Sequence, residues 1–378
     1  MRWVLLVLLA GLRPSQGHPP PLCHNGAWLE VAPGAVERGE VMPSVMCRRQ
    51  PACVIHTHLT RGRCASRPLE EDWPVLPMPS PRGNASLKAL LMEHWRDRTV
   101  IFVGDSITEG IWDWLVCDSH REGLRSVRLD DTERGGGRGR IDAQVRSLRD
   151  PEFRARAAAF WAAWFAETWG PEGPPLPMHT RVVAFPATGT LLVRLHAHRF
   201  VEADVASVLR LGHVTIFNYG LHYDYESDHT RSIYAADVRR LAQLLRPASE
   251  APGRVMMYRE TSAQHFQGTG AFTHWEQAHR GEAACSCEPL GAAAAADNKL
   301  LRMNEVARRE LAAEAPRVRV LPFYDFTAGL HYAHEEDYCA HESDLKRTQG
   351  CCDCSHFCYT PQLSGYVLAQ ILDGFTTD

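Results

Sequence analysis

The amino-acid sequence predicts an α/β protein of three layers, with a central, mostly parallel sheet, helices on both faces and a small disulfide-pinned N-terminal module. Short apolar runs typical of buried strands alternate with helical segments over most of the chain. Several of these strands end in small polar loops, as strands do at the carboxyl edge of a parallel sheet. The chain has 378 residues, 45% of them hydrophobic, which is enough for one large domain with a full core plus an extension.

The N-terminus has the layout of a secretory signal. Arg2 precedes an apolar run at 3–12, and small residues offer a cleavage point after Gly17. The run is shorter than the roughly 20 apolar residues that span a bilayer, so no stable membrane span is expected. We therefore expect residues 1–17 to be a signal peptide, and the protein to be secreted or to reside in the Golgi lumen. An uncleaved Golgi anchor is the alternative.

Twelve cysteines agree with this location, since an even number of cysteines in an oxidising compartment predicts disulfides. A zinc site is the competing interpretation for the cysteine cluster at 351–358, but no clean pair of Cys-x-x-Cys knuckles occurs, so no metal is expected. Residues 18–70 hold four cysteines and little periodicity, and we expect them to form the N-terminal module. The Pro-rich residues 71–86, with a glycosylation sequon at Asn84, are expected to be a linker.

The main domain opens with a helix and a buried strand. Residues 86–95 carry leucines and a tryptophan on one helical side, and the apolar run 100–103 is typical of a strand inside a parallel sheet. Gly104 ends this strand, and Ser106 stands where a helix begins. A serine on such a turn is well placed as a nucleophile, because the free N–H groups of the helix N-terminus stabilise an oxyanion. Capping of the helix by Asp105 and Ser106 is an equally good interpretation.

Strands and helices continue to alternate along the rest of the chain. Apolar runs predict strands at 181–185, 191–195, 213–220, 254–258 and 318–322. Helical spacing predicts helices at 153–169, 204–211, 228–245, 298–315 and 366–375. The Gly-rich segment 134–139 lacks the Gly-Lys-Ser/Thr ending of a phosphate loop and is expected to be a flexible surface loop. The loops at Gly104, Asn218 and Arg259 should converge at the carboxyl edge of the sheet, where ligands bind.

A base for Ser106 stands near the C-terminus, where Asp353 and His356 lie three residues apart among cysteines, on one loop or turn. At this spacing the carboxylate can orient one imidazole nitrogen and leave the other to take the Ser106 proton. Disulfides would hold that loop rigid. Taken alone, a turn residue at Asp353 and a surface histidine at His356, one of nineteen histidines, is the simpler interpretation.

These motifs stand in the order of a known family. Gly104-Asp105-Ser106 follows an early strand, Asn218-Tyr219-Gly220 a middle strand and Arg259–Phe266 a later one, and Asp353-Cys354-Ser355-His356 comes last. The set resembles the SGNH, or GDSL-type, hydrolase superfamily, and more narrowly the PC-esterase group that includes the plant trichome-birefringence-like polysaccharide O-acetyltransferases. The resemblance covers residues 23–375 and implies that residues 87–378 form an SGNH-like PC-esterase catalytic domain.

The resemblance implies acyl transfer in two steps. His356, oriented by Asp353, deprotonates Ser106, which attacks an acetyl ester and forms an acetyl-serine. The oxyanion hole implied by the family consists of the Ser106 N–H, the Asn218 amide and a glycine N–H. Gly220 and Gly189 are the candidates for that glycine.

The side chains expected to bind the substrate are Asp105, Arg259 and Tyr223, and His265 is expected either to bind the substrate or to support the residues that do. Trp112, Trp114 and Tyr225 could also contact a sugar, although core packing is the better interpretation of the two tryptophans. The sequence departs from the family near this side of the site: Glu109-Gly110 replace an Arg-Asn pair, Tyr223-Asp224 replace a Trp-Trp pair, and Ala263 replaces a proline. These departures concern the choice of substrate more than the chemistry.

The function that we expect is O-acetyl transfer to a glycan or polysaccharide hydroxyl by a monomer without a bound cofactor. An acetyl donor, such as acetyl-CoA or an acetylated carrier, would be the co-substrate. The alternatives are a secreted carbohydrate O-acetylesterase, which would use the same residues, and a catalytically silent glycan-binding protein. A net charge of −4 with scattered arginines gives no sign of a nucleic-acid partner.

Overall fold

The computed structural model describes residues 23–24, 27–28, 87–131, 138–168, 180–223, 227–266, 270, 287–291, 298–337, 352–357 and 361–375. Strands β1 (Cys23–His24) and β2 (Ala27–Trp28) form an antiparallel pair. The predicted signal peptide and linker, and the rest of the predicted N-terminal module, lie outside the described residues. Among the described residues, no helix combines the length and the apolar character needed to cross a membrane.

A seven-stranded sheet forms the middle layer of the main domain. In spatial order its strands are β4 (Val127–Asp131), β5 (Thr180–Phe185), β6 (Thr190–His196), β3 (Thr99–Gly104), β7 (Val214–Phe217), β8 (Val255–Arg259) and β9 (Arg319–Leu321). The five strands β6, β3, β7, β8 and β9 run parallel to one another, whereas β5 is antiparallel to both of its neighbours, β4 and β6. The predicted mostly parallel sheet is therefore confirmed.

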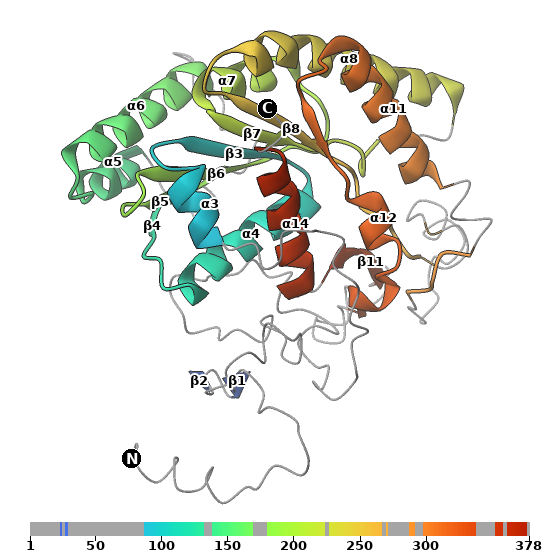
Figure 1. The fold of residues 1–378 in the computed structure, drawn as a ribbon, viewed down its shortest axis with the longest axis horizontal. Helices are drawn as coiled ribbons and strands as arrows, with labels where there is room; N and C mark the ends of the chain where they lie inside the picture. The colour runs from blue at the N-terminus through green and yellow to red at the C-terminus, as the bar shows by residue number, and fades with distance from the viewer. Residues whose placement is uncertain are drawn as a thin grey trace, which may run out of the picture.

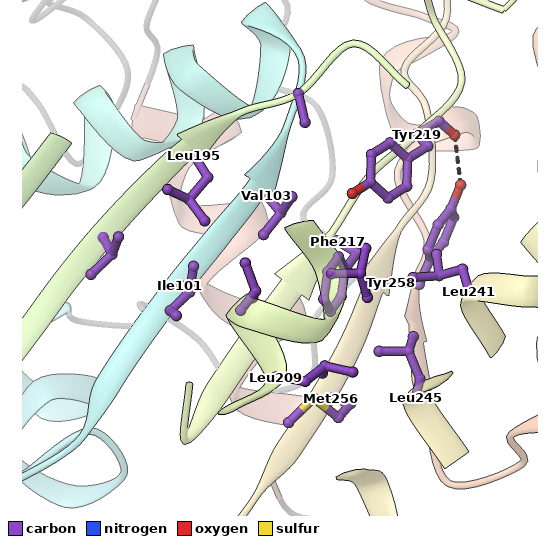
Figure 2. Packing of buried hydrophobic residues seen from close by; sticks show 14 of the residues in the cluster. Ile101, Val103, Leu195, Leu209, Phe217, Tyr219, Leu241, Leu245, Met256 and Tyr258 are labelled. Carbon is purple, nitrogen blue, oxygen red and sulfur yellow. Dashed lines mark hydrogen bonds between the residues drawn. The ribbon is translucent and has the colours of Figure 1, made fainter. Parts of the chain in front are cut away.

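The central strand β3 explains why the sheet needs a layer on each face. All six of its residues are buried. Ile101 and Val103 belong to one core cluster, and Val100 and Phe102 belong to another, because successive side chains of a strand point to opposite faces. Figure 2 shows the first of these clusters, with Ile101 and Val103 beside residues of the neighbouring strands.

Helices cover both faces (Figure 1). Residues of α5 (Arg138–Arg146), α6 (Pro151–Thr168), α7 (Glu202–Leu211), α8 (Asp228–Glu250) and α11 (Lys299–Glu314) pack in the cluster that contains Ile101. Residues of α3 (Leu87–Glu93), α4 (Ser106–Arg121) and α14 (Pro361–Asp373) pack in the cluster that contains Val100. The short helix α12 (Tyr324–Thr327), a 3₁₀ turn (His331–Ala333) and an antiparallel pair, β10 (His334–Asp337) and β11 (Cys352–Phe357), complete the described chain.

The structure corrects two local predictions and adds one strand that the sequence pattern did not indicate. The edge strand β4 was not expected, since only one of its sides is paired and its apolar pattern is weak. Arg138 and Gly139, expected in a surface loop, begin helix α5, while 132–137 lie outside the described residues. Asp353 and His356, expected on a loop or turn, belong to strand β11.

Candidate active site

Ser106 is the first residue of α4, directly after the turn that ends β3. The cap of this helix is Asp105, whose Oδ1 accepts hydrogen bonds from the N–H of Ile107 at 3.0 Å and of Thr108 at 3.4 Å. The turn needs a glycine, because a Cβ on Gly104 would lie 2.3 Å from Thr108 Oγ1 and 2.9 Å from the Asn218 carbonyl oxygen. The Ser106 hydroxyl is therefore not used as the cap.

The Ser106 hydroxyl instead belongs to a chain of hydrogen bonds that ends on β11. Ser106 Oγ donates to Nε2 of His356 at 2.7 Å, and Nδ1 of His356 donates to Oδ2 of Asp353 at 2.6 Å. The His356 side chain is 20% exposed, and Ser106 is half-buried, so a substrate can reach both groups. The structure thus brings Ser106 next to His356, which lies 250 positions later in the sequence, and to its neighbour Asp353.

Asp353 is held as a charged acceptor. Its Oδ1 accepts hydrogen bonds from the backbone N–H groups of Ser355 at 3.0 Å and of His356 at 2.9 Å. Burial raises the pKa of the Asp353 carboxyl, but the adjacent His356 and these hydrogen bonds outweigh burial and lower the pKa well below its usual range. An ionised Asp353 fixes the proton of His356 on Nδ1 and leaves Nε2 able to accept a proton.

Strand β11 is fixed from several sides. A disulfide joins Cys354 to Cys287. The backbone N–H of His265 donates to the carbonyl of Cys354 at 3.0 Å, and Gln264 Nε2 donates to Ser355 Oγ at 2.5 Å. These contacts hold Asp353 and His356 on a short strand that the apolar pattern of the sequence does not predict.

His265 is buried beside β11, which favours its expected supporting role over contact with a substrate. Its ring is fully buried, with Nε2 2.9 Å from the carbonyl of Ala328 and Nδ1 2.6 Å from Nε2 of His334. His334 Nδ1 in turn donates to the carbonyl of His356 at 2.9 Å. The two rings therefore connect the 3₁₀ turn region to the backbone of His356, and His334 is a positioning residue that the sequence did not reveal.

Asn218 does not offer its amide to the space beside Ser106. Its Nδ2 donates to the carbonyl of Arg259 at 3.0 Å and to Thr261 Oγ1 at 3.3 Å, and the residue is 1% exposed. The expected oxyanion role of the Asn218 side chain is corrected to a link between the loops after β7 and β8. The backbone N–H groups of Ser106 and Gly220 make no hydrogen bond within the described part of the chain, so both stay candidate oxyanion donors.

Asp105 and Arg259 are also structural. Arg259 is 3% exposed and donates to Thr108 Oγ1 at 3.0 Å and to the carbonyl of Glu260 at 2.8 Å. Its guanidinium lies 4.8 Å from the centre of the Phe323 ring and 3.9 Å from Asp105 Oδ1. Burial lowers the pKa of Arg259 to about 10, which leaves it charged. Because both side chains are buried under the first turn of α4, their predicted contact with substrate is corrected.

Tyr223 is a core residue as well. It is 4% exposed, and its hydroxyl donates to Asp237 at 2.8 Å, so its predicted substrate role is corrected. Trp112 and Trp114 are buried, as core packing predicts. Gly189 lies beside Asp97, at the amino end of β3, which rules it out as an oxyanion donor. Tyr225 and Asp224 lie outside the described residues.

Glu109 is buried three residues after Ser106. It pairs with Arg194, lies 4.0 Å from Arg181 and accepts a hydrogen bond from His196 at 3.1 Å. The carboxylate therefore neutralises buried arginines of β5 and β6 and is not open to an acceptor. Sequence spacing could not reveal this role, because its partners lie more than 70 residues away.

No group of three or more His, Cys, Asp or Glu side chains suited to a metal ion occurs among the described residues. In comparisons with known proteins, no family model and no curated protein matches the chain. The chemistry of the site therefore rests on the geometry of Ser106, His356 and Asp353.

Proposed function

We propose that the protein transfers an acetyl group to a glycan hydroxyl through an acetyl-serine on Ser106, as an SGNH-type enzyme of the secretory pathway. The observation that supports this proposal most directly is the chain of two hydrogen bonds from Ser106 through His356 to Asp353, at 2.7 and 2.6 Å. The family resemblance of the four motifs supports the choice of an acetyl ester as donor and of a sugar as acceptor.

The first half of the reaction forms the acetyl-serine. His356 Nε2 takes the hydroxyl proton while Ser106 Oγ bonds to the ester carbonyl carbon. The negative charge that develops on the carbonyl oxygen is accepted by the free N–H of Ser106, aided by the positive end of α4 and by the Gly220 N–H. The proton on Nε2 then passes to the leaving atom of the donor, which is oxygen in an ester and sulfur in acetyl-CoA, and the bond between that atom and the acyl carbon breaks.

The second half repeats these steps in reverse. A sugar hydroxyl loses its proton to His356 Nε2 and attacks the acetyl-serine, after which Ser106 recovers its proton. If water attacks instead of the sugar, the same residues make an esterase. No bound cofactor is required for either reaction, since the acyl donor is a co-substrate.

The experiment incubates the purified full chain with p-nitrophenyl acetate or acetyl-CoA, with and without a panel of oligosaccharides, and analyses protein and sugars by mass spectrometry. We expect a Ser106-containing peptide heavier by one acetyl group, and acetylated sugar. The matched control is Ser106→Ala, which keeps the fold and lacks the nucleophile.

The outcomes separate the alternatives. Release of free acetate with no acetylated sugar would replace the transferase proposal with the esterase. A folded protein that shows neither turnover nor labelling would leave only the silent glycan-binding protein. Equal turnover by wild type and Ser106→Ala would remove Ser106 from the chemistry.

A further inference from the structure

Two stacked histidine rings join the loops that flank the carboxyl end of β3, and His222 is near enough to Asp105 and His356 to interact with them electrostatically. In the sheet β3 lies between β6 and β7, and Gly104 pairs with His196 at the end of β6. His198 belongs to the loop after β6, and His222 belongs to the loop after β7. Their rings stack with centres 4.1 Å apart and planes 18° apart. Because β3 lies between β6 and β7, a contact between the loops that follow β6 and β7 crosses the carboxyl end of β3. Ser106 begins α4 at that end.

The two rings are held in place by contacts between the same two loops. Arg199 Nε donates to the carbonyl of His222 at 3.2 Å. The Tyr223 hydroxyl accepts from the N–H of Phe200 at 3.0 Å and donates to Asp237. The buried Tyr223 thus acts as a positioning residue for this surface, and little side-chain or loop entropy remains to be lost when a ligand binds.

This surface can donate hydrogen bonds and carries positive charge. His198 and His222 are exposed, and their ring nitrogens make no hydrogen bond within the described residues. Burial and nearby histidines lower the pKa of both rings, so each is a neutral N–H donor near pH 7. Arg199 is exposed and supplies a permanent charge, while the acid that acts on both rings, Asp105, is only 1% exposed. A guanidinium with adjacent N–H donors suits a carboxylate or a sulfate.

We propose that His198, His222 and Arg199 form a subsite for the anionic group of an acidic sugar, either a carboxylate or a sulfate ester. This inference rests on the proposed function and narrows its acceptor to acidic glycans. The stacked rings present their N–H groups, and Arg199 pairs with the anion, so that a neighbouring hydroxyl of the same glycan is held near Ser106.

Binding can be measured without turnover on the full chain carrying Ser106→Ala. The probes are N-acetyllactosamine, its 6-sulfated form, trigalacturonic acid and a neutral trisaccharide of the same length, titrated by calorimetry at pH 7. We expect at least one acidic probe to bind about tenfold tighter than its neutral partner, the scale of one charge-assisted hydrogen bond. The sulfate and carboxylate probes distinguish the two sources of the anion.

The variants Arg199→Gln and His198→Gln/His222→Gln should lose that preference, whereas His94→Gln should keep it. His94 precedes β3 at the opposite edge of the sheet and stacks on Phe375. Equal binding of acidic and neutral probes, no binding of any acidic probe, or a preference that survives in the variants would overturn the subsite. A failure of the proposed function is detected in a different experiment, because Ser106 of the wild-type protein would then not become acetylated.

Discussion

Asp105 and Ser106 are adjacent, yet the structure gives them different tasks. The Asp105 carboxylate satisfies two N–H groups of the first turn of α4, and its charge favours the positive end of the helix. The Ser106 hydroxyl, one position later, makes its hydrogen bond to His356. A cap on the preceding residue leaves the serine hydroxyl available for chemistry while its own N–H stays free.

Ser106→Ala should abolish acyl transfer and leave stability nearly unchanged. Removal of the nucleophile is expected to lower turnover about 10⁴-fold or more. Because the lost hydroxyl bonds a half-exposed histidine, the midpoint of thermal unfolding should stay close to that of the wild type. Asp105→Ala is the matched comparison and should cost about 1–2 kcal/mol through the lost cap, and more because it removes a buried negative charge beside Arg259. A larger stability loss for Ser106→Ala than for Asp105→Ala would contradict this division of tasks.

Glu109→Gln should be far more destabilising than an ordinary surface change. The side chains of Arg194 and Arg181 are 1% and 7% exposed, and loss of the carboxylate removes the negative charge that both of them face, although Arg181 keeps Asp113 at 3.5 Å. Breaking a buried ion pair in this way costs about 3–5 kcal/mol. Urea unfolding measures the loss, and Glu202→Gln, which removes an exposed pair with Arg240, is the control. A small loss at Glu109 would mean that water reaches these arginines.

Strand β11 brings Asp353 and His356 to Ser106 although its sequence does not resemble a strand. Its six residues, Cys352–Phe357, include no β-branched residue, and the alternation of apolar and polar side chains stops after Ser355. The strand is stabilised by the disulfide of Cys354, by its pairing with β10 and by hydrogen bonds from Gln264 and His265. A pattern of hydrophobicity does not contain such contacts. The hydrogen bond between Asp353 and His356 was predicted from their spacing together with the other motifs, since the spacing alone favoured a simpler interpretation.

Replacement of Cys287 and Cys354 by alanine should impair the site as well as the fold. The disulfide closes a loop of 67 residues, and loss of such a crosslink is expected to cost about 4 kcal/mol. Because Asp353 and Ser355 flank Cys354, β11 should become less well positioned, and labelling of Ser106 by a fluorophosphonate should slow. The measurements are thermal unfolding and the labelling rate below the unfolding range. An unchanged rate would show that β10, Gln264 and His265 position β11 without the disulfide.

At the scale of the whole molecule, the layers were predictable and the direction of polar side chains was not. Buried apolar runs such as β3 and β7 identify a sheet covered on both faces, because only such strands lack alternation. Sequence position also showed that Asn218 and Arg259 follow parallel strands. It did not show that both side chains turn into contacts between loops, where they are 1% and 3% exposed. Burial of a polar group depends on partners distant in sequence, and a linear pattern does not contain them.

The free energy of unfolding should decrease as the pH falls from about 6.5 to about 4. Burial holds the pKa of His265 at about 4 and the pKa of His334 well below its usual value, whereas unfolded histidine titrates near 6.5. In this range the unfolded chain binds protons that the native state does not, so stability is lost with decreasing pH.

One such histidine contributes about 1.4 kcal/mol per pH unit, and His265 and His334 act in the same direction. Asp353 contributes in a lower pH range: because its native pKa is lowered, its stabilisation is present above the unfolded value near 3.9 and is lost only at lower pH.

The neutral rings of His265 and His334 have two N–H groups for three contacts. A third proton would complete this chain of hydrogen bonds but would place a charge in the core. Urea unfolding at pH 7.5, 6.5, 5.5 and 4.5 measures the slope, and His265→Gln should be less stable near pH 7 with a shallower slope. A flat wild-type profile would show that the pair accepts the third proton and that hydrogen bonding outweighs burial.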